Sequence, residues 1–300
     1  MRKIAFMCAA ILMAASQMFA ANRLDLKSIT SGEFAGERMA AVKPLADGET
    51  YAQISSDGSQ IVKYSFKTGR QTGVLFDVNT VRGAKIKRVD GYIMGPDGRR
   101  MLIQTDTKSI YRRSFTATYY IYDIGNNKME PLSSGGPQQT PLFSPDGNQI
   151  AFVRDNNIYL VKLLYDNAES QVTKDGRRNE IINGVPDWVN EEEFGMSRSM
   201  VFTADGRQIC WIRYDETAVK EYSFPLFRGM NPAMDEYGEY PGAYTYKYPV
   251  AGAANSVVSV HSYDIKSHQT RRIDVPLDAD GYIPRIVMTS DPTKVCLLYT

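Results

Sequence analysis

A repeated Asp-Gly turn is the feature that most constrains how this chain can fold. Each copy consists of Asp-Gly, two polar residues and a short apolar strand, as in the segment from Asp146 to Phe152. Glycine supplies the positive φ that a tight hairpin turn needs. A degraded copy spans Ser290 to Cys296, and the four clear copies begin at Asp57, Asp97, Asp146 and Asp205.

The spacing of these turns predicts the architecture. Consecutive clear copies lie roughly 40 to 60 residues apart, and periods of about this length built from short strands are typical of propeller blades. Between the turns, alternating aromatic residues predict further strands, as from Tyr64 to Arg70 and from Tyr120 to Asn127. We therefore predict an all-β fold, a β-propeller of four-stranded antiparallel blades.

Two segments break the period. The first runs from about residue 175 to 200 and contains Asp187-Trp188-Val189-Asn190-Glu191-Glu192-Glu193-Phe194, three consecutive carboxylates between hydrophobic anchors. Packed carboxylates repel one another, so we expect a cation opposite them: a metal, a basic side chain or a ligand ammonium group. The second runs from Pro225 to Tyr248, is rich in Pro, Gly and Tyr, and is predicted to be a functional loop or an interaction arm.

The two ends of the chain carry separate predictions. Residues 1–21 have a charged start, an apolar stretch and small residues suited to cleavage after Ala20 or Ala21, which predicts a signal peptide. We therefore expect an exported protein, periplasmic or secreted, with no membrane association after cleavage. The propeller is expected to occupy residues 22–300. No closing strand follows Thr300, which predicts an incomplete propeller, roughly half of one, that belongs to a longer protein.

Charge and motif content exclude several function classes. The formal net charge is +1, which does not favour binding to nucleic acid. We expect no metal and no cofactor, because the chain lacks His-Glu-x-x-His and Cys-x-x-Cys spacings and its Asp-Gly turns lack the pattern of a calcium loop. Cys210 and Cys296 are interpreted as buried small hydrophobes in preference to a disulfide, and His261 and His268 as surface residues.

Three stretches resemble one known family. They are the Glu-rich segment from Asp187 to Phe194, the segment from Arg112 to Tyr119, and Tyr246-Lys247-Tyr248-Pro249-Val250-Ala251-Gly252-Ala253-Ala254-Asn255. Together they make the chain similar to the N-terminal β-propeller of dipeptidyl peptidase IV, in the prolyl oligopeptidase group of serine peptidases. The similarity extends through essentially all of the chain after the predicted signal peptide.

The resemblance implies a function and a site. The family releases dipeptides from peptide N-termini, with Pro or Ala as the second residue. A short inserted helix carries the double-Glu motif, in which Glu192 and Glu193 bind the free ammonium group while Glu191 faces elsewhere. Arg112 is implied to hold a backbone carbonyl of the dipeptide, and a shift of one residue to Arg113 stays open. Peptides with free N-termini and a homodimer are the implied partners.

The catalytic half of such enzymes is not evident in the sequence. Its α/β-hydrolase domain carries a Gly-x-Ser-x-Gly motif, and the nearest approach, Gly195-Met196-Ser197-Arg198-Ser199, lacks the second Gly. We therefore assign no catalytic residue and expect the chain alone to be inactive. The alternative is a non-catalytic periplasmic propeller that binds peptides or proteins. Such a protein would keep the Asp-Gly turns but would not need the acidic stretch together with Arg112.

Overall fold

The computed structural model describes residues 25–36, 39–230 and 233–300, so the predicted signal peptide lies outside the described part. The chain forms two compact units, Met1–Ala41 and Val42–Thr300. In the first unit, helix α2 (Leu26–Thr30) begins with a capping box in which Asp25 accepts a hydrogen bond from the Ser28 backbone N–H. The rest of the description concerns the second unit.

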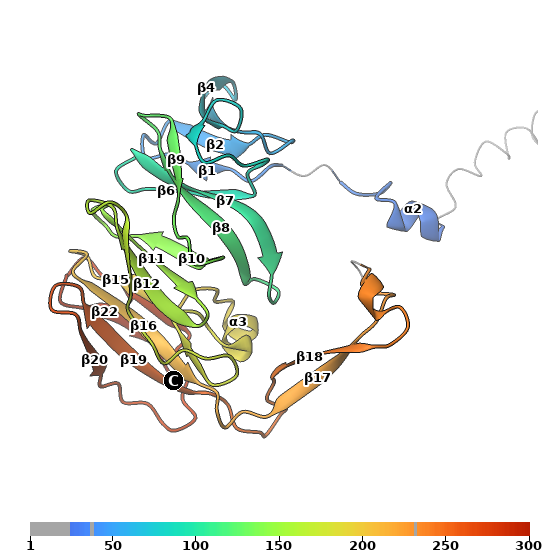
Figure 1. The fold of residues 1–300 in the computed structure, drawn as a ribbon, viewed down its shortest axis with the longest axis vertical. Helices are drawn as coiled ribbons and strands as arrows, with labels where there is room; N and C mark the ends of the chain where they lie inside the picture. Colours follow the sequence, from blue (N-terminus) through green and yellow to red (C-terminus); the bar gives the residue numbers. More distant parts are fainter. Residues whose placement is uncertain (1–24, 37–38, 231–232) are drawn as a thin grey trace, which may run out of the picture. The chain divides into compact units, whose positions relative to one another are not determined.

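The second unit is built of antiparallel sheets that follow one another along the chain (Figure 1). The first sheet contains β1 (Lys43–Pro44), β2 (Thr50–Ile54), β3 (Gln60–Ser65) and β4 (Gln71–Asp77). The second contains β6 (Gly91–Met94), β7 (Arg100–Ser109), β8 (Phe115–Asp123) and β9 (Lys128–Pro131), with β5 (Arg82–Gly83) parallel to β9 at its edge. The third contains β10 (Gln139–Phe143), β11 (Gln149–Arg154), β12 (Asn157–Lys162) and β13 (Ala168–Gln171).

The fourth sheet is interrupted by both inserted segments. Its strands are β14 (Ile181–Asn183), β15 (Met200–Phe202), β16 (Gln208–Asp215), β19 (Val257–Asp264) and β20 (Gln269–Ile273), and a separate pair follows in β21 (Arg285–Met288) and β22 (Val295–Leu298). Both β14 and β15 pair with β16. These sheets confirm the predicted all-β fold with four-stranded antiparallel blades.

The Asp-Gly turns connect strands within the sheets, as predicted. The glycines of the four clear copies all have φ between 65° and 74°. In the turn after β10, Oδ1 of Asp146 accepts hydrogen bonds from the Asn148 backbone N–H (3.1 Å) and the Ser144 hydroxyl (2.5 Å), so the carboxylate fixes the turn from within. A further Asp-Gly turn, at Asp47 and Gly48 between β1 and β2, was not among the predicted copies.

The central strands of the second and third sheets are buried on both faces, because each of these sheets packs between two others. In β7, Met101 and Ile103 belong to the core between the first and second sheets, whereas Leu102 belongs to the core between the second and third. In β11, Phe152 and Val153 divide in the same way between two cores. Alternate side chains of a strand point to opposite faces, so a continuous apolar run here indicates a strand covered on both sides.

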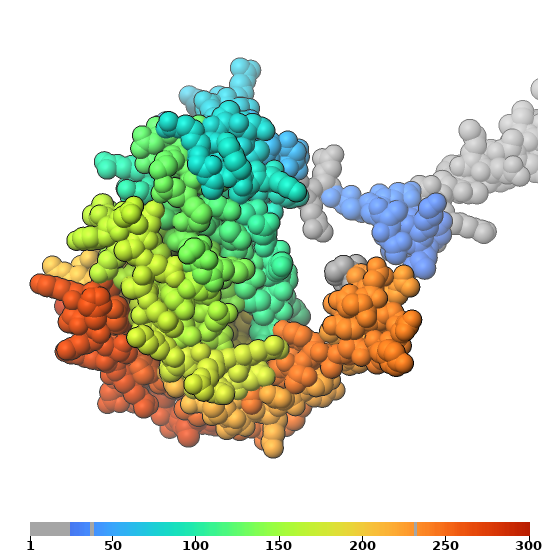
Figure 2. All heavy atoms as spheres, in the orientation of Figure 1, coloured from blue at the N-terminus to red at the C-terminus, as the bar shows by residue number. Residues whose placement is uncertain are grey.

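The two insertions have different structures. The first contains the predicted short helix, α3 (Trp188–Phe194). The second is an antiparallel hairpin of β17 (Glu221–Leu226) and β18 (Gly242–Lys247), with the single turn η1 (Asp235–Tyr237) between them. These two strands form a two-stranded sheet of their own, which projects in orange in Figure 2. The predicted loop is therefore largely a two-stranded arm.

The cysteine interpretation is half right. Cys210 is free and buried within β16, as predicted. Cys296 is also free, but it is exposed on β22. β22 pairs only with β21 in the described part of the chain, so one face of its apolar run stays uncovered.

Candidate functional site

Helix α3 is a short helix with well-satisfied ends. Its N-cap, Asp187, accepts hydrogen bonds from the backbone N–H and the side-chain amide of Asn190, both at 2.8 Å, and from the Ser256 hydroxyl. Its C-cap, Gly195, has φ 64° and donates its N–H to the Glu191 carbonyl. These caps fix a helix of seven residues, which would be too short to be stable by itself.

Aromatic rings join α3 to the two other segments that resemble the family. The Trp188 ring lies 4.3 Å from the Tyr248 ring and 6.4 Å from the Tyr246 ring, both on or next to β18. The Tyr246 ring also lies 5.4 Å from the ring of Tyr111, which precedes Arg112. Three segments that are far apart in the sequence thus meet at one place.

The three consecutive glutamates point in different directions. Successive residues of an α-helix are rotated by roughly 100° about its axis, so three neighbours cannot share one face. Glu191 is buried, Glu192 is partly buried and Glu193 is exposed. Each carboxylate therefore has a different environment.

Glu191 ties the helix to the β7–β8 loop, which carries the arginines. Its Oε1 accepts hydrogen bonds from the backbone N–H groups of Arg113 (2.7 Å) and Ser114 (2.8 Å). Its Oε2 is buried and has no hydrogen-bond partner. Glu191 thus faces away from its two neighbours, and the described structure gives it the position of an anchor for the loop.

Glu192 forms an ion pair with Arg112, with 3.1 Å between Oε2 of Glu192 and Nε of Arg112. The Arg112 side chain is 72% exposed and the Glu192 side chain 15%. Within the described part of the chain, Glu193 has no ion-pair partner. The structure thus places Arg112, on the β7–β8 loop, next to α3, which carries Glu192 and Glu193.

Arg112 and Arg113 occupy different places. The Arg112 guanidinium reaches Glu192, whereas the Arg113 side chain lies beside Gly195 and lines a separate cavity. The cation that the sequence predicts opposite the acidic run is therefore, in this structure, a basic side chain, Arg112. The two neighbouring arginines therefore have different surroundings, and of the two only Arg112 pairs with a glutamate of α3 among the described residues.

A cavity of about 520 Å³ adjoins this loop and contains a residue that sequence reasoning missed. Tyr111, Ser114, Tyr246 and Glu216 are among its lining residues. Burial, with the nearby carboxylate of Asp187, raises the pKa of Glu216 to about 7. Glu216 directly follows the apolar strand β16, which is the only local sign that its side chain would be buried.

The two histidines lie on β19 and in the turn that follows it, outside α3. The His261 ring is half-buried and stacks on the Trp211 ring at 5.6 Å, so it is only partly exposed at the surface. His268 is exposed in the β19–β20 turn and hydrogen-bonds to the Tyr263 hydroxyl at 2.7 Å. Among the described residues, no group of His, Cys, Asp and Glu side chains is arranged to hold a metal ion, and no helix is long and apolar enough to cross a membrane.

Similarity to known sequences agrees with this arrangement. Residues 95–300 match the family described as the dipeptidyl peptidase IV N-terminal region. A probable dipeptidyl-aminopeptidase B of Chaetomium globosum is 36% identical over 259 residues, which are 83% of this chain and 26% of the relative. Another, of Emericella nidulans, is 38% identical over 195 residues, 62% of this chain and 21% of the relative.

A solved structure extends the similarity to the fold. The crystal structure of Porphyromonas gingivalis dipeptidyl peptidase 4 superposes with a TM-score of 0.85 and 39% identity, over 93% of this chain and 38% of that chain. This chain therefore spans only a part of the length of the relatives that it matches. On its sequence, its fold and the segments that meet at α3, the chain belongs to the dipeptidyl peptidase IV N-terminal region family.

Proposed function

We propose that this chain is the substrate-selecting propeller of an exported dipeptidyl peptidase IV-like serine peptidase. The full enzyme releases N-terminal X-Pro or X-Ala dipeptides. Glu192 and Glu193 bind the free N-terminal ammonium group of the peptide, and Arg112 binds a backbone carbonyl of the same dipeptide. Family membership supports the enzyme class, because the relatives described above are named dipeptidyl peptidases or dipeptidyl-aminopeptidases.

The observation that carries the proposal is the ion pair between Arg112 and Glu192. A carboxylate has about four lone-pair positions, so the contact with Arg112 at 3.1 Å leaves Glu192 able to accept further hydrogen bonds. The two carboxylates of Glu192 and Glu193 exceed the single guanidinium by one negative charge. A peptide ammonium group supplies that charge together with three hydrogen-bond donors.

The same charge balance explains selection for a free N-terminus. Acetylation removes the ammonium charge and replaces three donors by one amide N–H. Hydrogen bonds to charged groups contribute about 1.5–3 kcal/mol each, so losing one costs roughly tenfold or more in affinity. The site would therefore position a peptide by its end and exclude internal segments of a chain.

Peptide binding to the 300-residue chain tests the proposal. Calorimetry should show that Ala-Pro-Gly amide binds at least about tenfold more tightly than its N-acetyl form. Glu192→Gln, Glu193→Gln and Arg112→Ala should each weaken binding of the free peptide. The control Glu49→Gln, an exposed carboxylate at the β1–β2 turn, should not. Equal affinity for the free and acetylated peptides would refute the proposal.

Hydrolysis provides a second measurement. The sequence contains no Gly-x-Ser-x-Gly motif, so the chain alone should not release p-nitroaniline from Gly-Pro p-nitroanilide. Release that survives repurification would contradict the assignment of a selecting role without catalysis.

Export is part of the same proposal. Residues 1–21 act as a cleaved leader, so the processed chain should begin at Ala21 or Asn22. Expression of the unmodified gene in a Gram-negative host, followed by fractionation and N-terminal sequencing, tests this. A cytoplasmic chain that retains Met1 would contradict it.

We further propose that the β17–β18 hairpin mediates a homodimer. Its exposed aromatic side chains include Tyr222, Phe227 and Tyr240, and exposed apolar groups concentrated on a projection favour association. Sedimentation should show a dimer that dissociates when Phe227 and Tyr240 are replaced by Ser. A monomer at all concentrations of the unmodified chain would refute this part.

A further inference from the structure

A second cavity, of about 520 Å³, is also lined by the loop that carries the arginines. Arg113 and Ser114 of the β7–β8 loop line it, as do Gly195 and Met196 at the end of α3. Among the described residues that line it, the charged ones are all cations, namely Lys43, Arg113, Arg198 and Arg285. We call this space the cationic cavity.

None of these four cations forms an ion pair within residues 25–36, 39–230 and 233–300. Nζ of Lys43 donates to the Tyr92 carbonyl and lies 4.2 Å from the centre of the Tyr92 ring. These partners are neutral and do not cancel the charge. The whole chain is nearly balanced, with 35 basic and 34 acidic residues, so the local excess does not follow from composition.

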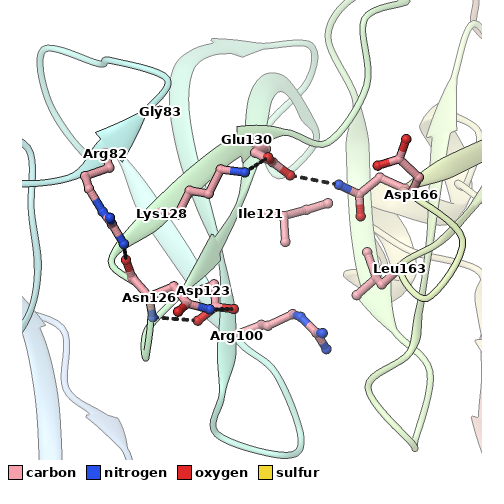
Figure 3. A pocket seen from close by; sticks show the side chains of 11 residues that line it. Arg82, Gly83, Arg100, Ile121, Asp123, Asn126, Lys128, Glu130, Leu163 and Asp166 are labelled. Carbon is pink, nitrogen blue, oxygen red and sulfur yellow. Dashed lines mark hydrogen bonds and ion pairs between the residues drawn. The ribbon is translucent and has the colours of Figure 1, made fainter.

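Another cavity shows the ordinary arrangement of charge in this protein. It has a volume of about 610 Å³ and is lined by both acidic and basic side chains (Figure 3). There, Lys128 forms an ion pair with Glu130 at 2.5 Å. Charges that line a cavity are thus matched in one case and unmatched in the other.

The C-terminal end of α3 explains the position of only one of the four cations, Arg285. Nη1 of Arg285 donates to the Phe194 carbonyl at 2.7 Å, which satisfies a carbonyl at the C-terminus of α3. Lys43 and Arg198 have no hydrogen bond to the helix. Desolvation lowers the pKa of the Lys43 ammonium and of the Arg198 guanidinium, although both residues remain exposed to solvent.

The cationic cavity adjoins the proposed peptide site through two short connections. Arg113 directly follows Arg112, and Arg285 contacts the carbonyl of Phe194, the residue after Glu193. The side chain of an N-terminal residue leaves from the same carbon atom that bears the ammonium group. A long side chain on that residue can therefore point from the acidic site toward the cations.

We propose that the cationic cavity binds the side-chain carboxylate of an acidic N-terminal residue, so that the chain prefers peptides beginning with Glu or Asp. This inference rests on the proposed function, because it places the peptide ammonium group at Glu192 and Glu193. The ligand is then bound at both of its charges. The acidic helix holds the ammonium group, and Arg198 and Arg285 hold the carboxylate.

Paired peptides test the inference on the 300-residue chain. Glu-Pro-Gly amide and Gln-Pro-Gly amide differ by one charge and have nearly the same shape. A charge-assisted hydrogen bond contributes about 1.5–3 kcal/mol, so the Glu peptide should bind about tenfold more tightly. The preference should fall toward unity in Arg198→Gln and as salt is raised.

Two further variants show whether the effect depends on charge at this position. Arg198→Lys should keep most of the preference, because it keeps the charge. Arg207→Gln should keep all of it, because Arg207 is 82% exposed in an Asp-Gly turn and pairs with Asp205. Circular dichroism should show all three variants folded. A preference that survives Arg198→Gln, or one that is lost in Arg207→Gln, would overturn the assignment.

N-acetylated peptides and glutarate separate this inference from the proposed function. If acetylation weakens both peptides and the Glu and Gln forms bind equally, the cationic cavity has no such role and the proposed function stands. If acetylation changes nothing while the Glu preference persists and requires Arg198, the ammonium site is refuted and the carboxylate site stands. If glutarate alone binds as tightly as Glu-Pro-Gly amide, the occupant is a free dicarboxylate and the peptide assignment is overturned.

Discussion

Replacing Glu191 with Ala should loosen the β7–β8 loop without touching either charge of the ion pair. The two hydrogen bonds from Arg113 and Ser114, at 2.7 and 2.8 Å, end on one oxygen of a fully buried carboxylate. Removing the acceptor leaves two partly buried N–H groups unpaired, and each costs up to about 1–3 kcal/mol. We expect the free energy of unfolding to fall by about 3 kcal/mol.

Glu191→Gln is the matched comparison. Its amide oxygen can replace Oε1 and accept both hydrogen bonds, and its amide nitrogen replaces Oε2, which has no partner to lose. The cost should be about 1 kcal/mol, for the lost charge assistance alone. The surface control Glu180→Ala, at a carboxylate that is half exposed and 3.8 Å from Arg177, should cost less than about 0.5 kcal/mol.

Urea unfolding and amide hydrogen exchange measure these effects. The amides of Arg113 and Ser114 should exchange faster in Glu191→Ala than in the unmodified chain. The amides of the distant strand β3 should keep the same relative order of exchange rates. Peptide affinity should fall as well, because Arg112 lies in the loosened loop. Wild-type stability in Glu191→Ala, together with unchanged protection of Arg113 and Ser114, would refute the anchoring role of Glu191.

Three further predictions concern the pH dependence, the turns and the thiols. The folded-state pKa of Glu216, about 7, lies above its ordinary value of 4.5, because burial favours the protonated carboxyl group. The stability that the protonated Glu216 contributes is therefore complete below pH 4.5 and is lost as the pH rises toward 7 and above. Urea unfolding at pH 5 and pH 8 should show that this loss, about 3 kcal/mol, disappears in Glu216→Gln; an equal pH dependence in both proteins would contradict the burial argument. Gly147→Ala should lower the free energy of unfolding by about 1 kcal/mol, because Ala must adopt φ near 71°, and a thermal melt with unchanged Tm would contradict this. Iodoacetamide should modify the exposed Cys296 and leave the buried Cys210 unmodified in the folded chain, as mass spectrometry can show; the reverse pattern would mean that β22 is covered.

The repeat predicted the fold because its signal is local. Each Asp-Gly turn forms with residues a few positions away, as between Asp146, Ser144 and Asn148, so sequence spacing reports it directly. The extra turn at Asp47 was missed because the strand that follows it, β2, contains the polar residues Thr50 and Gln53 and so gives no continuous apolar run. The hairpin arm was interpreted as a loop because of its Pro and Gly content, although Tyr244, Tyr246 and Tyr248 alternate with the period of a strand.

The candidate site could be predicted only in part. The acidic helix and Arg112 were found because they lie in short, specific stretches of sequence. The hydrogen bonds that Arg113 and Ser114 donate to Glu191 could not be foreseen, because they join positions 78 and 77 residues apart and depend on tertiary packing. The burial of Glu216 and the unmatched cations around Arg198 are likewise products of tertiary structure.

A double-mutant cycle that combines N-acetylation of the peptide with Glu192→Gln tests the central claim most directly. If Glu192 binds the ammonium group, the two changes must be coupled, because each removes one side of the same interaction. Acetylation should weaken binding of Ala-Pro-Gly amide about tenfold or more in the unmodified chain, and much less in Glu192→Gln. Additive effects of the two changes would show that the ammonium group is bound elsewhere, and would contradict the account.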